Sequence, residues 1–427
     1  MKLHWQILLA ILLAILVGAV LEPHHGIGGF TVFALLDFLG TLFLNALHMI
    51  VVPLIVSSII CGITSAGAGQ NLGRMGVKTI SLYMVSSLLA ILMGLFLVNL
   101  TTPGIVDGAP AGDRLNLSSQ EELEISLSKV EGRGSDDIAG IFLRMVPTNV
   151  VDSAATGDML GLIVFALLFG IFMLRLTGKP GEALKNFWQG VFEVMMAMTM
   201  FVMRFAPIGV FGLVGKTVMS TGFAAFGPLF VFFFTVVAAL LLHMFVSLAL
   251  MLKLLGRVNP LRHYRAMMPA MLTAFSTASS SATLPVTIEC VEKNAGVSNR
   301  TSSFVLPLGA TINMDGTALY ECAAALFIAQ AYGLDLSFSQ QFLVVVLALL
   351  TSIGVAGIPA ASLVAISVIL TAVGLPLEGI GMLLVTDRIL DMMRTAVNVF
   401  SDSCCAVIVA STEGETGLYG QVGSQKT

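Results

Sequence analysis

Seven polar or charged side chains recur along one face of the hydrophobic segment around residue 390. Relative to Asp391, their offsets of −4, −3, 0, +3, +4, +7 and +11 place all of them within about ±60° of one direction on an α-helix. Five of the seven are charged, and at mid-bilayer they would cost roughly 12–17 kcal/mol if they faced lipid. This polar stripe is therefore expected to face the protein interior, and it consists of Asp387, Arg388, Asp391, Arg394, Thr395, Asn398 and Asp402.

A second group of polar side chains interrupts the preceding apolar segment. Its carboxylate, amide and hydroxyl oxygens stand beside two glycines, where the backbone is least shielded. Such hard oxygens suit a small alkali cation better than zinc or copper. The side chains are Thr311, Asn313, Asp315, Thr317 and Glu321, and the glycines are Gly309 and Gly316.

The stripe also offers opposite charges to one ligand. The planar guanidinium of Arg394 can bind a carboxylate through two hydrogen bonds, and Asp391 on the same face can meet an ammonium group. Three consecutive hydroxyls, Ser279, Ser280 and Ser281, before a following half-helix favour a second carboxylate. These residues indicate an acidic zwitterion bound with cations at mid-membrane. The alternative is that the charged residues form structural ion pairs inside the membrane.

The chain that carries these residues is too apolar to be a soluble protein. Of its 427 residues, 57% are hydrophobic and 11% are charged, against about 25% charged residues in a soluble protein. The net charge of −4 leaves no basic surplus to meet phosphate, which excludes a nucleic-acid partner. Five cysteines lie in apolar segments without metal-ligand spacing and are expected to be buried, reduced thiols. They are Cys61, Cys290, Cys322, Cys404 and Cys405.

Six stretches are apolar and long enough to cross a bilayer core of about 30 Å as helices. The first has no A-x-A site after it, so we expect it to be a permanent helix and not a signal peptide. With the N-terminus inside, 13 of the 21 Lys and Arg residues fall on the cytoplasmic side, which predicts cytoplasmic termini and a mobile outer loop over 102–156. The stretches are roughly 5–22, 30–65, 79–101, 157–175, 186–214 and 223–253.

After residue 260, two segments are divided into apolar halves too short to span singly. One is split at 276–281 by Ser and Thr residues, and the other at 354–359 by Gly and Pro residues. Interrupted backbone at membrane depth indicates a site lined by protein or water, as in secondary transporters. Ordinary helices that use Ser and Gly for close packing are the alternative. The expected order is hairpin, long helix, hairpin, long helix, over 263–292, 302–330, 338–375 and 379–411.

Four runs of residues, in this order, resemble the dicarboxylate/amino acid:cation symporter family, which includes the sodium-coupled glutamate/aspartate and neutral amino-acid transporters. The resemblance covers nearly the whole chain. The runs are Ser279-Ser-Ser-Ala-Thr-Leu-Pro285, Asn313-Met-Asp-Gly-Thr317, Gly357-Ile-Pro359, and Asp391-Met-Met-Arg-Thr-Ala-Val-Asn398 with Asp402.

The resemblance implies an all-α polytopic membrane protein with eight transmembrane helices and two re-entrant helical hairpins arranged as inverted repeats. It further implies a homotrimer in the cell membrane that couples sodium to uptake of glutamate or aspartate by an elevator movement, with a proton as a candidate second coupled ion. The implied scaffold and trimerisation domain covers 1–78 and 157–222, and the implied transport domain covers 79–101 and 223–412. The loop 102–156 would be extracellular and the tail 413–427 cytoplasmic.

Site residues carry over from the family by position. Arg394 would hold the substrate side-chain carboxylate and Asp391 its amino group. The implied substrate site comprises Ser279, Ser280, Ser281, Thr317, Gly357, Ile358, Pro359, Asp391, Arg394, Thr395 and Asn398. The implied sodium ligands are Gly309, Asn313, Asn398 and Asp402 at one site, Thr311, Ser352 and Ile353 at another, and Tyr83, Ser86, Ser87, Asn313 and Asp315 at a third.

Two further positions, one that departs from the family and one that matches part of it, also bear on function. Family members usually place a further arginine near the substrate, but the corresponding positions here are Ala278 and Met392. We expect Arg388, one turn before Met392, to take over that role. Glu321 matches the glutamate linked to proton co-transport in animal glutamate transporters, and because an ionised carboxylate is costly at this depth, it is the proton-coupling candidate.

Other functions remain open on the sequence alone. A C4-dicarboxylate carrier would also use Arg394, but its substrate has no ammonium group to pair with Asp391, and a neutral amino-acid exchanger would leave Arg394 unpaired. A channel would need a continuous polar lining or a repeated carbonyl filter, and neither is visible in the sequence. An enzyme is disfavoured because the serine run has no nearby catalytic histidine. No cofactor is expected, since sodium is a transported ion.

Overall fold

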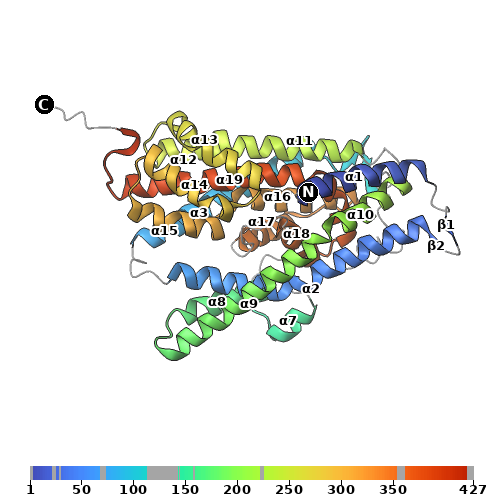
Figure 1. The fold of residues 1–427 in the computed structure, drawn as a ribbon, viewed down its shortest axis with the longest axis horizontal. Helices are drawn as coiled ribbons and strands as arrows, with labels where there is room; N and C mark the ends of the chain where they lie inside the picture. Colours follow the sequence, from blue (N-terminus) through green and yellow to red (C-terminus); the bar gives the residue numbers. More distant parts are fainter. Residues whose placement is uncertain are drawn as a thin grey trace.

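The protein is described here by a computed structural model that covers residues 3–21, 26–27, 30–67, 74–112, 143, 145–156, 159–221, 226–352 and 361–420. Helices dominate it (Figure 1). The strands of the described part are two short antiparallel pairs, β1 (Gly26–Ile27) with β2 (Phe30–Thr31) and β3 (Ile105–Val106) with β4 (Ala109–Pro110). The all-α fold class is therefore confirmed.

Most helices of the first half follow the predicted spans, but a short helix at Val150–Thr156 lies in the predicted loop and one predicted span is broken. The long apolar runs form helices because a continuous helix satisfies every backbone polar group within the segment. The helices are α1 (Leu3–Val20), α2 (Val32–Gly67), α3 (Arg74–Thr101), α7 (Val150–Thr156), α8 (Met159–Met173), α9 (Lys179–Arg204), α10 (Ala206–Thr221) and α11 (Phe226–Leu242).

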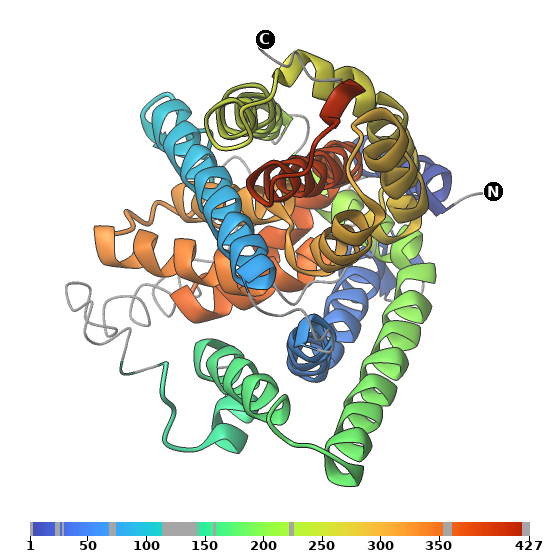
Figure 2. The same cartoon turned by 90° about the vertical axis from the view of Figure 1, so that its left-hand side faces the viewer.

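The second half alternates broken and long elements. In Figures 1 and 2 its helices pack together, while α2, α8 and α9 lie to one side of them. After α11 come the π-helix η2 (His243–Leu248), α12 (Ala249–Leu254), α13 (Pro260–Thr277), α14 (Ser280–Glu289), the π-helix η3 (Cys290–Asn294), α15 (Asn299–Ile312), α16 (Asp315–Ala331), α17 (Phe338–Ser352), α18 (Ala361–Val373), the 3-10 turn η4 (Leu377–Gly379), α19 (Ile380–Thr412) and the 3-10 turn η5 (Leu418–Gly420).

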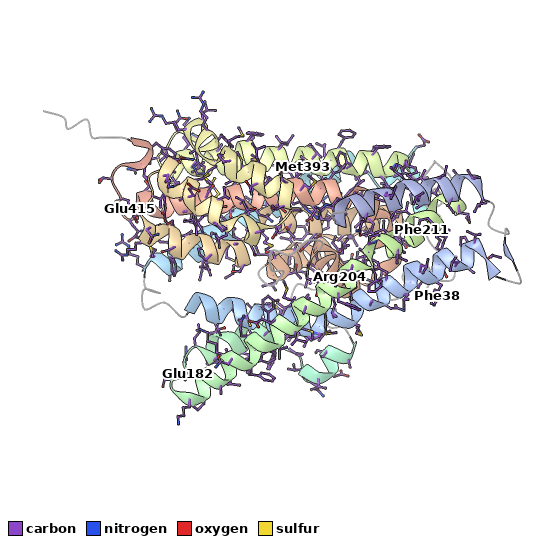
Figure 3. All side chains as sticks on the ribbon, viewed as in Figure 1. Phe38, Glu182, Arg204, Phe211, Met393 and Glu415 are labelled. Carbon is purple, nitrogen blue, oxygen red and sulfur yellow. The ribbon has the colours of Figure 1, made fainter. Side chains whose placement is uncertain are left out.

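By length and apolar composition, three helices of the described part can cross a membrane. They are α3, the continuous run Phe226–Leu254 and α19, and the bent pair α9 and α10 passes the same test as a fourth span. Large apolar side chains point outward along the long helices, and Leu12, Phe38 (Figure 3), Phe96 and Phe234 each expose 60% or more of their surface. Soluble monomers rarely expose extended apolar surface, so these faces suit lipid.

Two expected continuous helices are broken. The span predicted at 186–214 is instead α9 and α10, which meet at a bend of 54° beside Phe205. Pro207 explains the bend, because proline fits the first turn of a new helix but not the interior of a continuing one.

The prediction of one long helix over 302–330 is also wrong in one respect. This segment divides at Asn313 and Met314 into α15 and α16. Asn313 has an extended backbone, with φ −99° and ψ 92°. Its side chain instead bonds to partners on α3 and α19, which stabilise the interruption.

The break predicted in the first hairpin is confirmed, but it is shorter than expected. Ser276 and Thr277 still belong to α13, and the turn consists of Ala278 and Ser279. Ala278 has the left-handed backbone φ of 49°, and the Ser279 hydroxyl caps α14 by accepting from the backbone N–H of Ala282 at 3.2 Å. In the second hairpin, α17 and α18 flank the predicted break at 354–359, which lies outside the described residues.

The core centres on α16, all of whose residues except Gln330 are buried. It packs against α3, where a Cβ on Gly94 would lie 2.9 Å from the Leu319 carbonyl oxygen, so only glycine allows this approach. All five cysteines are buried thiols without disulfides, as predicted.

The predicted outer loop has ordered structure at both ends. Its first residues form the β3–β4 hairpin, which contacts α16 through a hydrogen bond from the Gly104 N–H to Gln330 Oε1 at 3.2 Å. Its last residues form α7. The loop is therefore not a uniformly irregular connection.

Candidate functional site

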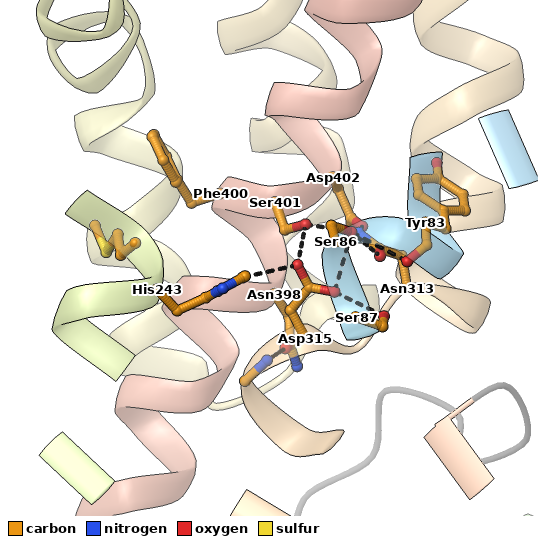
Figure 4. Close-up of polar contacts among 12 residues, drawn as sticks. Tyr83, Ser86, Ser87, His243, Asn313, Asp315, Asn398, Phe400, Ser401 and Asp402 are labelled. Atoms are coloured by element: carbon orange, nitrogen blue, oxygen red, sulfur yellow. Dashed lines mark hydrogen bonds and ion pairs between the residues drawn. The ribbon is translucent and has the colours of Figure 1, made fainter. Parts of the chain in front are cut away.

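The break between α15 and α16 brings polar residues of four helices together inside the bundle (Figure 4). Asp315 is the first residue of α16 and has no exposed surface. Its Oδ1 accepts hydrogen bonds from Ser87 Oγ at 2.7 Å and Ser86 Oγ at 3.2 Å, both on α3. Its Oδ2 accepts from Ser401 Oγ of α19 at 2.6 Å and lies 3.0 Å from His243 Nε2 of η2.

Asn313 joins this cluster to Asp402. Its Nδ2 donates to Asp402 Oδ1 at 2.9 Å and to Ser401 Oγ at 3.0 Å, and its Oδ1 lies 3.2 Å from Ser86 Oγ. Ser86 Oγ also lies 3.1 Å from the Tyr83 carbonyl. Ser86 has one hydroxyl proton but three acceptor oxygens in reach, so the site has more acceptors than donors. An added cation would suit that imbalance.

Glycine 309 makes room for these oxygens. A Cβ at Gly309 would lie 2.4 Å from Asp402 Oδ1 and 2.9 Å from the Tyr83 hydroxyl oxygen. The Tyr83 hydroxyl donates to the Val305 carbonyl at 2.7 Å, which leaves the oxygen's lone pairs available. The structure thus brings together Tyr83, Ser86, Ser87, Asn313 and Asp315, the residues predicted for one sodium site, and sets Gly309 and Asp402 beside them.

Asn398 ties α19 to the start of α16. Its Oδ1 accepts from the Gly316 N–H at 2.7 Å, and its Nδ2 donates to Thr317 Oγ1 at 3.1 Å. A Cβ on Gly316 would lie 2.7 Å from the Arg394 carbonyl oxygen, so the two helices touch backbone to backbone. The predicted neighbours Thr317, Asn398 and Arg394 therefore share one region of the core.

The Arg394 guanidinium is 1% exposed and lies between two carboxylates. Its Nη2 donates to Asp387 Oδ1 and to Asp391 Oδ1, each at 3.0 Å, and its Cζ lies 3.9 Å from the centre of the Tyr320 ring. Among the described residues, Nε and Nη1 have no hydrogen-bond partner. Two buried donors are thus available to a further acceptor. Arg388 Nη1 approaches the other oxygen of Asp391 at 3.4 Å.

Glu321 is also completely buried, one turn along α16 from Thr317. Its Oε2 accepts from Thr351 Oγ1 of the second hairpin at 2.8 Å. Its Oε1 has no partner among the described residues. An ionised carboxylate is costly in this setting, which suits a group that takes up and releases a proton.

Among the described residues, the hydrogen bonds of several predicted site residues stay within their own helix. Thr311 Oγ1 donates to Leu308 O, Ser352 Oγ donates to Leu349 O, and Thr395 Oγ1 donates to Asp391 O. Ser280 is buried and Ser281 exposed beside the capping Ser279 at the turn of the first hairpin, and α14 packs against α19. The remaining predicted residues lie outside the described part of the chain, and they are Ile353, Gly357, Ile358 and Pro359.

Sequence reasoning missed four residues of this region: His243, Tyr320, Thr351 and Ser401. A signal existed for His243, because an ionisable residue inside an apolar span is a functional candidate by default. Ser401 adjoins Asp402 and Tyr320 adjoins Glu321, but nothing local distinguishes them from core residues. Among the described residues, no group of three or more His, Cys, Asp or Glu is arranged to hold a metal ion, and the predicted sodium ligands are mainly hydroxyl and amide oxygens.

Comparison with known proteins decides the family. The profile of the sodium:dicarboxylate symporter family matches residues 3–412. The chain belongs to this family. Membership makes it an all-α, multi-pass membrane transporter and not an enzyme, as the sequence motifs predicted.

Relatives within the sodium:dicarboxylate symporter family align along nearly the whole chain. A proton/glutamate-aspartate symporter of Escherichia coli strain K12 is 38% identical over 414 residues, which cover 96% of this chain and 93% of the relative. A proton/sodium-glutamate symport protein of Bacillus caldotenax is 36% identical over 413 residues, covering 97% and 95%. Excitatory amino acid transporter 3 of Mus musculus is 32% identical over 441 residues, covering 94% and 84%.

Proposed function

We propose that this protein takes up glutamate or aspartate by symport with Na⁺ and that Glu321 carries a coupled proton. The observation that carries the proposal is the Arg394 guanidinium, which is buried yet keeps two donors without partners among the described residues. A neutral ligand would leave these donors unpaired, whereas a side-chain carboxylate can accept from both. The names of the bacterial and animal relatives support an acidic amino acid.

In this proposal the substrate ammonium group binds Asp391, whose two oxygens now contact Arg394 and Arg388. Asn398, Thr317 and the serines of the first hairpin bind the main-chain carboxylate, and Thr395 and the 357–359 tip of the second hairpin complete the site. Arg388 competes with the ammonium group for Asp391 and so tunes substrate exchange. Transport kinetics of Arg388→Ala test this role, and unchanged kinetics in a folded variant would contradict it.

The cation sites use the oxygen cluster around Asp315. The excess of acceptors over protons at Ser86 supports a cation there, with Tyr83, Ser87 and Asn313 as further ligands. Gly309, Asn398 and Asp402 would contribute to a second site, and Thr311, Ser352 and Ile353 to a third. Hydroxyl, amide, carboxylate and carbonyl oxygens are the ligands that hard cations prefer.

From the two domains that the family resemblance implies, we propose the movement that transports these ligands. The scaffold (1–78 and 157–222) contains an ion pair between Lys216 of α10 and Asp37 of α2 at 2.6 Å, and the transport domain (79–101 and 223–412) contains the whole polar cluster. We infer an elevator movement of the second domain along the first, a homotrimer formed by the scaffold, and cytoplasmic termini. Light scattering in detergent should give three chain masses for the assembly.

A C4-dicarboxylate is the second candidate substrate. The observation in its favour is Arg388, because this second guanidinium already partners Asp391, so the site does not depend on an ammonium group for that purpose. Competition between aspartate and succinate distinguishes the two substrates.

The test of the substrate assignment uses Arg394→Cys in proteoliposomes. We expect the KM for aspartate and glutamate to rise about 100-fold or more and uptake of serine or alanine to appear, because the carboxylate loses its partner while Asp391 remains. Gradients of Na⁺, protons and K⁺ are imposed one at a time. Aspartate uptake at parental KM in the variant would contradict the assignment, and wild-type uptake without any response to Na⁺ would contradict the proposed coupling.

A further inference from the structure

His243 is a buried polar residue that the proposed transport cycle does not yet use. It lies in the predominantly apolar run Phe226–Leu254 and has no exposed surface. The helix changes there to the π-helix η2, which begins at His243. Such turns are rare and often mark functional positions, because they redirect side chains at some cost to the helix.

The hydrogen bonds of the imidazole indicate which nitrogen carries the proton. Nε2 lies 3.0 Å from Asp315 Oδ2, and Nδ1 has no partner among the described residues. A proton on Nδ1 would be a buried donor without an acceptor, which costs more than a bare lone pair. The neutral ring with its proton on Nε2 therefore fits best, and this N–H donates to Asp315.

The other three donors to Asp315 differ from His243 in one respect. The hydroxyls of Ser86, Ser87 and Ser401 can rotate and turn a lone pair toward a cation. The Nε2–H of a fixed ring cannot do so, since it has no lone pair to offer. When hydroxyls reorient around an arriving cation, His243 is the donor that can stay on Asp315.

We propose that His243 is a positioning residue for cation binding: its Nε2–H holds Asp315 Oδ2 so that Oδ1 stays directed at Ser86 and Ser87. The inference rests on the proposed cation site at Asp315. Figure 4 shows the arrangement, with His243 and the α3 serines on opposite sides of the carboxylate. Without the imidazole, the carboxylate loses its fixed orientation and binds Na⁺ more weakly.

The test compares two substitutions of His243 in proteoliposomes at fixed pH. His243→Gln can place an amide N–H near the position of Nε2, whereas His243→Leu removes the donor. We expect His243→Leu to raise the half-saturating Na⁺ concentration about tenfold, since a hydrogen bond to a charged group is typically worth that factor or more. The KM for aspartate at saturating Na⁺ should change less than about twofold, and His243→Gln should recover most of the Na⁺ affinity.

A matched control is His263→Gln. His263 is equally buried and bonds Tyr419 through Nδ1 and Ser403 through Nε2, but it does not contact Asp315. Its substitution should leave the Na⁺ dependence unchanged. If His243→Leu does not yield folded protein, His243→Asn serves instead, because its shorter amide cannot reach Asp315 from the same backbone position.

Three outcomes would overturn the inference: parental Na⁺ affinity in His243→Leu, equal losses in the Gln and Leu variants, or loss of the pH dependence of uptake in His243→Gln. The last would mean that the ring carries a proton. Asp315→Asn separates this inference from the proposed site. If that variant keeps parental Na⁺ dependence, the site itself is wrong. If it loses Na⁺ dependence while His243→Leu does not, only the role of His243 is wrong.

Discussion

Charged side chains inside this bundle occur as compensated groups. Arg394 lies between Asp387 and Asp391, and Asp315 is surrounded by hydroxyl and imidazole donors. Removing one partner of such a buried pair typically costs about 3–5 kcal/mol, because the other charge is left without a partner. Glu321 is less fully compensated, since among the described residues it forms no ion pair, accepts a hydrogen bond from Thr351 alone and leaves its other oxygen without a partner. It is therefore the carboxyl group that we propose as the proton carrier.

This contrast leads to a prediction for Glu321→Gln. The amide resembles the protonated carboxyl group but cannot release a proton, so we expect uptake to lose most of its dependence on pH while Na⁺ dependence remains. Initial rates of aspartate uptake across a pH series measure the effect. Glu193→Gln, on the exposed face of α9, is the control and should retain the parental profile. A pH profile of Glu321→Gln that matches the parent would rule out the proton-carrying role.

At the scale of elements, interruptions and close approaches position the site. The break between α15 and α16 places Asp315 and Gly316 at a helix N-terminus, where backbone N–H groups lack helical partners, and Gly316 donates to Asn398. Helix α15 approaches α19 closely enough that Gly309 has almost no room beside Asp402. Element contacts of this kind determine which oxygens can surround one ion.

Gly309→Ala should accordingly disrupt the proposed cation site beside Asp402. Its Cβ would lie 2.4 Å from Asp402 Oδ1, so Asp402 or α15 must move. We expect at least a tenfold higher Na⁺ requirement or a melting temperature several degrees lower in detergent, since overpacking typically costs about 1–3 kcal/mol. Gly190→Ala is the matched control, because a Cβ there meets nothing within 4 Å. Equal behaviour of the two variants would show that the close approach at Gly309 is unimportant.

The start of the C-terminal tail forms hydrogen bonds with the N-terminal ends of α3 and α15. Lys78 of α3 donates to Glu413, and Glu415 accepts from the Ser298 N–H at 2.8 Å and from the hydroxyls of Ser298 and Thr301. Burial alone would raise the pKa of Glu415, but these hydrogen bonds outweigh it and leave that pKa below its ordinary value. The hydrogen bond from Lys78 likewise lowers the pKa of Glu413.

A lowered pKa in the folded state means that the unfolded state binds more protons. The stabilisation by Glu415 is therefore complete above its ordinary value of 4.5 and is lost as the pH falls through the lower folded value. We expect Glu415→Gln to melt below the parent near neutral pH, with a difference that shrinks in acid. Thermal unfolding of both proteins over a pH series is the measurement. A difference that does not vary with pH would contradict the ionised contact.

At the scale of the whole molecule, the proposed elevator movement requires that the transport domain and the scaffold move relative to each other. The contact between Leu213 of α10 and Gly381 of α19 crosses the boundary between the two predicted domains. A Cβ on Gly381 would lie 3.6 Å from Leu213 Cβ, within the spacing of about 3.5–4.5 Å found in disulfides. This geometry allows a covalent test of the elevator movement.

Leu213→Cys combined with Gly381→Cys should lose most uptake on oxidation and regain it on reduction, while substrate binding persists. A pair inside the predicted scaffold is the control: a Cβ on Gly170 would lie 3.1 Å from Ile63 Cβ, so a shift of a few tenths of an ångström brings Ile63→Cys and Gly170→Cys to disulfide spacing. Its oxidation should leave uptake unaffected. Full transport by the oxidised α10–α19 pair, with the cross-link verified, would contradict the domain movement.

Much of this organisation can be predicted from the sequence. The inward orientation of the polar stripe of α19 can be predicted, because the helical period puts those residues on one face and the cost of charge in lipid turns that face toward the protein interior. The two hairpins can be predicted because neither apolar half of each segment is long enough to cross the bilayer core. Asn313 shows the limit of such reasoning, since a polar residue inside an apolar run looks the same whether the helix continues or breaks.

Contacts between segments that lie far apart in the sequence could not be predicted in this way. His243 and Asp315 are 72 positions apart, and their hydrogen bond depends on a π-helical turn and on how η2 packs against α3 and α19. The pairing of Thr351 with Glu321 likewise depends on where the second hairpin meets α16. Periodicity and burial cost act within one segment and thus reveal which face turns inward. Which side chains meet across the core depends on the relative depth and rotation of packed helices, and these arise only when the whole bundle is assembled.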